Sequence, residues 1–205
     1  MTKIPLFVLD VVAFPGGEAI LHIFEPRYRK LINRCMSEPR PFGIVRAKDG
    51  AVGEIGCEMV VAKVLRRYPD GRMEVRVRGV DRIRVRDVTA HEDGYLEAEW
   101  SAVTEGPEDA DHALEDRLEE KYRAYAALAE DVENDPPPRG PRWSFRVAER
   151  LELPVVSRQE LLETLGENDR LRWLDERLDH LILDLRVRQE AQSLIRGNGR
   201  MKRPS

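Results

Sequence analysis

Apolar and polar residues alternate with a period of two along the first hundred residues of the chain. Two short apolar runs, residues 4–9 and 20–24, are separated by the turn sequence Phe14-Pro15-Gly16-Gly17. Further along, residues 60–64 and 73–77 alternate on either side of a Tyr-Pro-Asp-Gly turn. This pattern predicts β-strands, and the second pair of runs predicts a hairpin with one buried face and one face in water.

The same alternation continues after a glycine interrupts it at Gly79. Ile83 and Val85 resume the pattern, and residues 96–100 form a last alternating run. A glycine inside a strand indicates a bulge or a sharp bend. A single helix is expected among these strands, beginning at Pro26, which suits the first turn of a helix, and ending near Cys35. Short, closely spaced strands with one short helix predict a small, highly curved barrel over residues 1–104.

The period changes to that of a helix near residue 104. One amphipathic helix is expected over residues 114–132, ending before the proline-rich segment 135–141, and a second over residues 143–151. Ser157 and Glu160 have the spacing of a capping box, and Gly166 would end the helix that they start. The α+β fold predicted is therefore a barrel followed by a helical subdomain, residues 105–195, and a basic flexible tail, residues 196–205.

The last helix is expected to be long and to start at Asn168 or Asp169. It carries a leucine every three or four residues, at positions 171, 174, 178, 181 and 185. Such a seam is typical of helices that pack on their neighbours inside one bundle, which is the interpretation that we favour. A coiled coil between two chains is the alternative.

The charge distribution argues against a nucleic-acid binder. The 205-residue chain has a formal net charge of −4. Residues 105–135 hold twelve Asp or Glu against three Lys or Arg. The basic exception is a run of arginines at positions 76, 78, 82, 84 and 86. We interpret this run as the water-facing side of a strand, with contact to a phosphate backbone as the alternative.

Targeting and cysteine signals are sparse. The first residues lack the apolar core of a secretory signal, and no run of about 18 apolar residues could span a membrane. We therefore expect a cytoplasmic protein. The two cysteines, Cys35 and Cys57, lack the spacing of a zinc site and are expected to be free thiols.

The motifs of the common enzyme classes are missing from this sequence. It contains no phosphate-binding G-x-x-x-x-G-K-[ST], no G-x-S-x-G, no H-E-x-x-H and no glycine-rich dinucleotide fingerprint. The four histidines are scattered, and His22 is expected to be structural because neither a nucleophile nor a metal partner accompanies it. We therefore expect no enzymatic activity, no cofactor and no bound metal.

The order of several short motifs resembles the substrate-binding N-terminal domain of Lon proteases. The matching segments are Pro5-Leu6-Phe7, Leu9-Asp10-Val11-Val12, Phe14-Pro15-Gly16-Gly17, Leu21-His22-Ile23-Phe24-Glu25-Pro26-Arg27-Tyr28, Phe42-Gly43-Ile44-Val45, Val52-Gly53, Asp70-Gly71-Arg72, Gly79-Val80-Asp81-Arg82-Ile83 and Tyr95-Leu96-x-Ala98. The resemblance implies a pseudobarrel of the PUA-like kind followed by a helical subdomain. It also implies substrate recognition without ATP hydrolysis or proteolysis, since the chain contains neither of the domains that perform them in Lon.

The leading functional prediction is a non-catalytic module that binds unfolded or apolar protein segments, with a protease or chaperone as a further class of partner. Such a site needs an exposed apolar patch with polar edges. The candidate residues are Phe14, Pro15, Phe24, Arg27, Tyr28 and Trp143. We expect Phe14 to lie at the surface, on its Pro-Gly-Gly turn. Packing in the core is the alternative for each of the six, and it is favoured for Phe24 and Tyr28.

Two other functions remain open. PUA-like barrels elsewhere bind RNA, but the acidic composition and the lack of aromatic residues among the arginines count against RNA here. A small-molecule-binding module rests on the similarity of this domain to the N-terminal region of cereblon. The ligand pocket of cereblon lies in a different domain, so this interpretation is the weakest.

Overall fold

A computed structural model describes residues 3–48, 50–105 and 108–198 and divides the chain into two compact units. The first unit comprises Met1–Gly106 and Phe145–Leu165, and the second comprises Pro107–Ser144 and Gly166–Ser205. The helical part is therefore not the single stretch 105–195 that the sequence predicts, because residues 145–165 return to the barrel. The basic tail begins at the end of the last helix, and its residues 199–205 lie outside the described part.

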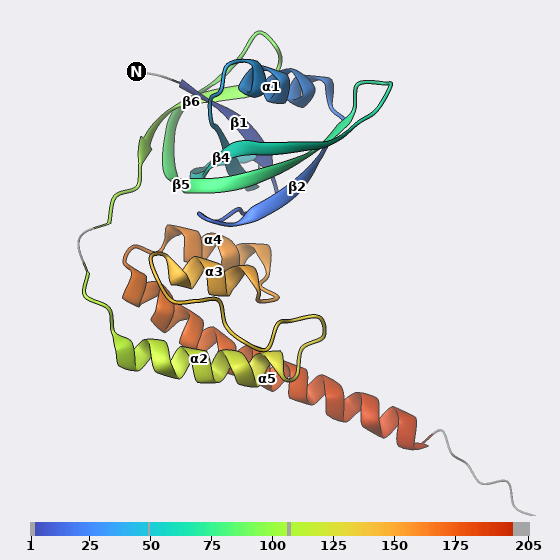
Figure 1. Ribbon diagram of the computed structural model, residues 1–205, viewed down its shortest axis with the longest axis vertical. Coiled ribbons are helices and arrows are strands. Elements are labelled where there is room, and N and C mark those ends of the chain that lie inside the picture. The colour runs from blue at the N-terminus through green and yellow to red at the C-terminus, as the bar shows by residue number, and fades with distance from the viewer. Residues whose placement is uncertain (1–2, 49, 106–107, 199–205) are drawn as a thin grey trace, which may run out of the picture. The chain divides into compact units, whose positions relative to one another are not determined.

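The first unit is built on a six-stranded sheet that closes on itself (Figure 1). Its strands are β1 (Lys3–Leu9), β2 (Glu18–Ile23), β3 (Phe42–Lys48), β4 (Ala51–Arg67), β5 (Met73–Ala90) and β6 (Leu96–Ala102). The order is β2-β5-β4-β3-β1-β6, and β5 pairs with β6 as well, which closes a ring of five strands. β2 lies outside this ring, attached to β5. The predicted α+β fold with a curved barrel is confirmed, and one pair within it, β1 with β3, is parallel.

The barrel interior is filled by the inward-facing residues of the alternating strands. Two apolar clusters make up this core, and the larger one includes residues of α1 (Pro26–Ser37). Tyr28, Leu31, Ile32 and Cys35 of α1 are all buried. The helix starts at Pro26 as predicted and ends two residues beyond the expected Cys35.

Gly79 is required by a close approach of two backbone segments. Its N–H donates to Gly17 O over 2.9 Å, and Gly79 O accepts from Gly16 N over 3.0 Å. A Cβ atom at position 79 would collide with the carbonyl oxygen of Phe14. The glycine thus lets the 14–17 turn lie directly against β5, which is a stricter constraint than the bend that the sequence predicts.

Replacing this glycine should therefore destabilise the barrel. We expect Gly79→Ala to lower the free energy of unfolding by about 2 kcal/mol, because the obstructing atom belongs to the backbone and cannot rotate away. Urea denaturation measures the change. Gly16→Ala is the control: nothing lies within 4 Å of its Cβ position and only its φ of +81° is unfavourable, so about 1 kcal/mol is expected. A smaller loss at position 79 than at position 16 would contradict the steric explanation.

Two short helices complete the first unit from the C-terminal half of the chain. α3 (Trp143–Glu149) joins the unit from Phe145 on, and α4 (Val155–Glu163) belongs to it entirely. The predicted capping box is wrong. α4 begins two residues before Ser157, after Pro154 at the N-cap, so Ser157 lies inside the helix. Gly166 likewise does not cap α4, because that role falls to Thr164.

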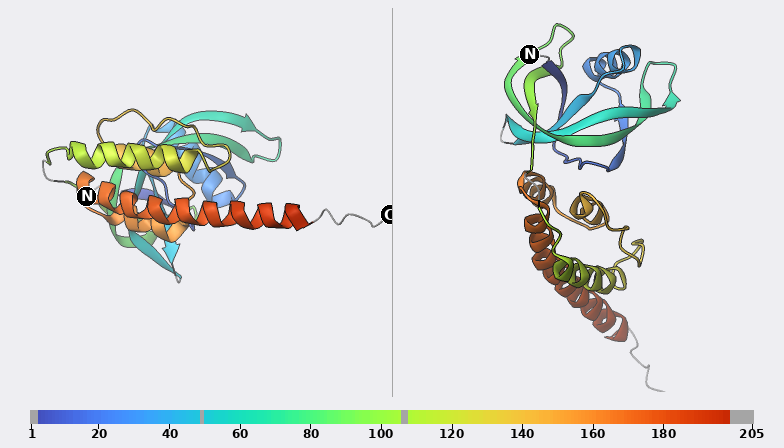
Figure 2. Two further views of the ribbon diagram at one scale, coloured as in Figure 1. Left: turned by 90° about the horizontal axis from the view of Figure 1, so that it is seen from below. Right: turned by 60° about the vertical axis from the view of Figure 1, so that its left-hand side comes forward.

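The second unit consists mainly of two helices, α2 (His112–Ala126) and α5 (Glu167–Asn198), which lie side by side (Figures 1 and 2). The Asp111 side chain accepts a hydrogen bond from Leu114 N and caps α2. α2 ends at Ala126, six residues before the predicted end. α5 starts at Glu167, and Asn168 does not cap it, because the Asn168 side chain bonds to the backbone of Asp109 and Asp111 instead.

The leucine seam of α5 is buried in the first half of the helix, as expected of a helix that packs on its neighbours. Leu171, Leu174 and Leu178 are at most 1% exposed. The C-terminal part of α5 extends past the end of α2 (Figure 2), and in the second half of α5 Leu183 and Val187 are more than half exposed.

Candidate functional site

Phe14 is the predicted site residue whose position differs most from expectation. It is fully buried, so the expectation that it lies at the surface is wrong. Its ring stacks on Phe145 with centroids 5.2 Å apart, and the Arg158 guanidinium lies 4.4 Å from the ring centroid. The turn at Gly16 and Gly17 is itself exposed or half-buried, but it directs the preceding phenylalanine into the unit.

Three more of the predicted residues are buried. Tyr28 stacks on Phe7, 3.8 Å between centroids, and its hydroxyl donates to Val8 O. Trp143 is 1% exposed and its indole N–H donates to Pro137 O. Pro15 is buried beside Phe14. These side chains stabilise the fold and offer little surface to a ligand.

Phe24 and Arg27 are the two predicted residues that reach solvent. Phe24 is 60% exposed, at the corner between β2 and α1. Arg27 is exposed too, with its guanidinium 4.5 Å from the Tyr28 ring centroid and 2.8 Å from the Glu25 carboxylate. Core packing, the favoured alternative for Phe24, is wrong. A binding role for Phe24 and Arg27 remains a prediction.

The outward face of β2 continues the apolar surface that Phe24 begins. Ile20 and His22 lie four and two residues before Phe24, so their side chains share its face of the strand. Ile20 is 62% exposed, and the His22 and Phe24 rings are 6.3 Å apart. From the sequence alone, residues 20–24 are described only as one short apolar run. The alternation of Ile20, His22 and Phe24 with the inward-facing Leu21 and Ile23 was the signal that could have found them.

Tyr68, in the turn of the β4–β5 hairpin, borders the same surface. Its ring lies 6.0 Å from His22, and the guanidinium carbons of Arg66 and Arg72 lie 4.7 and 5.2 Å from its centroid. The Tyr68 hydroxyl donates to the Glu74 carboxylate over 2.8 Å. That bond raises the pKa of Tyr68, so the phenol stays neutral at physiological pH.

We call these residues the Phe24 surface, defined as Ile20, His22, Phe24, Arg66, Tyr68 and Arg72. It combines exposed apolar and aromatic groups with two guanidinium groups at one edge. Aromatic and arginine side chains are the residue types most enriched in protein-binding hot spots. The arrangement can therefore bind apolar side chains and, at its edge, carboxylates or carbonyl groups.

The arginine run of β5 is not a continuous basic stripe. Arg82 is 1% exposed and donates to Leu162 O and Thr164 O and to the Glu105 carboxylate. The interpretation of all five arginines as water-facing is wrong at this position. Of the others, Arg76 lies 3.8 Å from Glu18 and Arg84 lies 3.2 Å from Glu54. These ion pairs offset the positive charge that a phosphate backbone would need.

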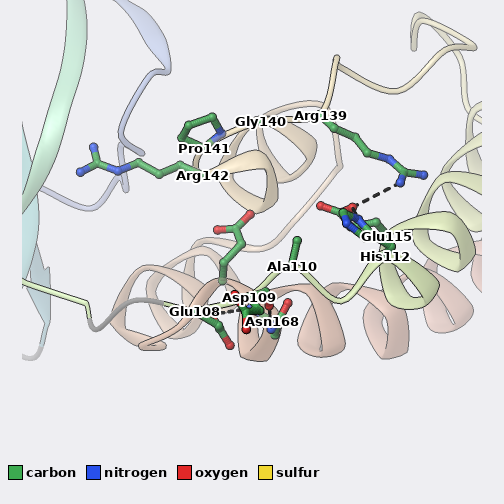
Figure 3. Close-up of a pocket in the computed structure, with 11 residues that line it drawn as sticks. Glu108, Asp109, Ala110, His112, Glu115, Arg139, Gly140, Pro141, Arg142 and Asn168 are labelled. Carbon is green, nitrogen blue, oxygen red and sulfur yellow. Dashed lines mark hydrogen bonds and ion pairs between the residues drawn. The ribbon is translucent and has the colours of Figure 1, made fainter.

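The second unit contains a pocket of about 570 Å³ (Figure 3). It lies between residues 108–115, residues 139–142 and the first turn of α5. Its polar groups largely bind one another. Arg139 pairs with Glu115, and Glu108 accepts from Asn168 N. This mutual pairing indicates a structural role for the side chains that line the pocket.

Reactive and metal-binding chemistry finds no support among the described residues. Burial raises the pKa of Cys35 to about 11 and that of Cys57 to about 12, so both remain unreactive thiols at neutral pH. The part of the chain that the structure describes brings together no three His, Cys, Asp or Glu side chains that could hold a metal. Across residues 3–48, 50–105 and 108–198, no helix has the length and apolar character needed to cross a membrane.

Known proteins are similar to this chain in sequence and in fold. Lon protease 1 of Hydrogenovibrio crunogenus (strain DSM 25203 / XCL-2) is 27% identical over 217 residues, which cover 95% of this chain and 26% of that protein. The chain thus spans about a quarter of the length of this relative.

Two solved structures superpose on most of the chain. A Lon N-terminal domain protein from Xanthomonas campestris has 26% identity and a TM-score of 0.64 over 85% of this chain and 97% of that one. The N-terminal domain of the Mycobacterium avium complex Lon protease has the same TM-score over 87% and 98% of the two chains, and at 17% identity it supports the fold alone. The family model of the substrate-binding domain of ATP-dependent protease La (Lon) matches residues 3–180. The protein therefore belongs to the family of Lon substrate-binding domains.

Proposed function

We propose that this protein is a non-catalytic module that binds unfolded or apolar segments of other proteins through the Phe24 surface. The observation that carries the proposal is the exposure of Ile20 and Phe24 on one face of β2, in a domain whose family is defined by substrate binding. The substrate-binding domain of Lon is itself a non-catalytic module.

The physical argument rests on the clustering of these groups. Single exposed apolar side chains are ordinary on protein surfaces and need no explanation. Ile20 and Phe24 instead follow each other along one strand face, next to the His22 and Tyr68 rings. Burying Phe24 and Ile20 beneath a bound segment would release about 1.5–3 kcal/mol for each side chain, less the part already shielded. A folded partner hides such apolar segments, so the surface favours unfolded ones.

The central test is Phe24→Ala, measured by fluorescence anisotropy with reduced, carboxymethylated α-lactalbumin as a permanently unfolded ligand. We expect about tenfold weaker binding, the loss typical of a hot-spot aromatic residue. Because the Phe24 side chain is mostly in solvent, the free energy of unfolding should change by less than about 0.5 kcal/mol. Leu183→Ala is a matched control, since Leu183 on α5 is 59% exposed. Equal affinities for the Phe24 and Leu183 variants would rule out the Phe24 surface.

Further parts of the proposal follow from the same module. We infer that the protein acts in the cytoplasm, catalyses no reaction of its own and presents bound segments to a protease or chaperone. Purified protein that hydrolysed ATP, with loss of that activity on substitution within this chain, would contradict the non-catalytic part.

A further inference from the structure

We propose that the free edge of β2 binds an extended peptide segment by adding it to the sheet as a further strand. The segment is apolar on both of its faces, as a central strand of another protein is before it folds. This inference rests on the proposed binding of unfolded proteins and specifies the backbone geometry and the class of segment.

The topology leaves one edge of β2 open. β2 lies outside the closed ring, and among the described residues it pairs with β5 alone. Every other strand of the sheet has a neighbour on both sides. β2 is thus the one described strand with a single partner along its whole length, which makes it a template for pairing. Residues 60–67 of β4 also pair with β5 alone, but this part of β4 carries Lys63, Arg66 and Arg67, charged residues of the kind that block strand addition.

The register identifies which backbone groups face that edge. Gly79 N donates to Gly17 O, and the antiparallel register continues with Glu18 opposite Arg78. Hydrogen-bonded and non-hydrogen-bonded pairs alternate in an antiparallel ladder. Ala19, Leu21 and Ile23 therefore bond to β5. The N–H and C=O groups of Glu18, Ile20 and His22 point away from β5, toward the open edge.

This edge lacks the features that normally block strand addition. Proteins protect exposed edges with lysine, proline, bulges or inward-pointing charges. The six residues of β2 read EAILHI, with a single charged residue, Glu18, at the start. An open and unprotected edge of this kind favours aggregation unless it serves for binding.

The side chains of β2 indicate what would bind. On the outward face an added strand would contact Ile20 and Phe24, both exposed. On the inward face it would lie beside Ala19 and Leu21, which are only partly buried and pack against the core. Apolar groups on both faces match a segment that is buried on both faces in its own folded protein. A second copy of this chain fits less well, since two six-residue strands provide far less than the roughly 1,200 Å² that a stable interface buries.

The test uses a ten-residue, fluorescein-labelled peptide with capped ends: eight valine, isoleucine and threonine residues between two lysines. Two versions carry four backbone N-methyl groups each. In one they occupy alternate residues, which blocks one edge of the peptide and leaves the other free. In the other they occupy four consecutive residues, which blocks both edges. Because the side chains and the number of methyl groups are the same, only the pattern of available N–H groups differs.

Strand addition predicts a clear difference in fluorescence anisotropy. The alternately methylated peptide should bind as well as the unmodified one, within about twofold. The consecutively methylated peptide should lose at least two hydrogen bonds, about fivefold in affinity for each. Equal affinities of the two methylated peptides would overturn the inference and would leave the binding function intact if Phe24→Ala still weakened binding.

A pair of variants tests the same point from the protein side. Ile20→Pro removes an N–H that faces the open edge and leaves the pairing with β5 intact, while Ile20→Ala removes only the side chain. We expect Ile20→Pro to bind the unmodified peptide about fivefold more weakly than Ile20→Ala. No binding of the unmodified peptide would overturn both the inference and the proposed function. Peptide-induced dimerisation of the protein, without sensitivity to the methylation pattern, would overturn the inference alone.

Discussion

Phe14→Ala should lower the free energy of unfolding by about 4 kcal/mol, the largest loss that we expect from any single substitution in this chain. The Phe14 ring is fully buried, stacked on Phe145 and covered by the Arg158 guanidinium. Removing it would leave a cavity where a strand-turn segment meets α3 and α4, two helices that reach the barrel from residues far along the chain.

Urea denaturation compares Phe14→Ala with Phe24→Ala, a change of the same side chain at an exposed position. We expect a large shift in the midpoint for the first and almost none for the second. A Phe14→Ala protein as stable as the parent, yet impaired in binding, would return Phe14 to the surface role that the sequence predicts. Loss of binding in Phe14→Ala or Trp143→Ala is otherwise explained by unfolding, and neither substitution can report on a binding site.

Arg82→Met should cost about 3 kcal/mol, because it breaks a buried ionic cluster by removing one partner. The Arg82 guanidinium donates to Leu162 O and Thr164 O, carbonyl groups at the C-terminal end of α4, and to the Glu105 carboxylate. Without it, the carbonyl groups lose these bonds while the helix end stays close to the barrel.

The control for this prediction is Arg78→Met on the same strand. Arg78 is exposed, and its replacement should change the free energy of unfolding by less than about 0.5 kcal/mol. Both variants can be compared by thermal denaturation followed by tryptophan fluorescence. If Arg82→Met were as mild as Arg78→Met, the contact of Arg82 with α4 would contribute no stability. The attachment of residues 145–165 would then have to rest on other contacts, such as the stacking of Phe14 on Phe145 and the bonds that Arg158 and Gln159 donate to Val12 O and Ile55 O.

The sequence predicted most of the strands and helices because their periodicity is a local property. The period of two identified the β4–β5 hairpin, and Pro26 marked the start of α1. The helix start at Ser157 failed because Pro154, the residue directly before α4, provided a competing start. The pairings of β1 with β3 and of β1 with β6 join residues far apart in the chain. No local pattern indicates such partners.

The candidate site was predicted in part, for the same reason. Phe24 was identified, but Ile20 and Tyr68 were not. Which face of β2 is exposed depends on how the strand lies against the rest of the barrel, and no local pattern shows this. Arg82 occupies the same alternating register as the exposed Arg78 and Arg86, and its burial depends on α4, Phe145 and Glu105, which follow later in the chain. Phe14 lies on a turn with every local feature of a surface loop, and its burial depends on Phe145, which follows more than a hundred residues later.

Because residues 145–165 belong to the same unit as the barrel, this unit can be completed only late in the synthesis of the protein. The last barrel strand, β6, ends at Ala102, whereas α4 ends at Glu163. At roughly 5–20 residues per second, the ribosome needs on the order of several seconds to make the intervening segment. During that interval the Phe14 ring and the Arg82 guanidinium lack their partners. The nascent barrel is therefore incomplete for much longer than its own strands take to emerge, and a ribosome-bound fragment ending near residue 104 should be more sensitive to proteases than one that extends past residue 165.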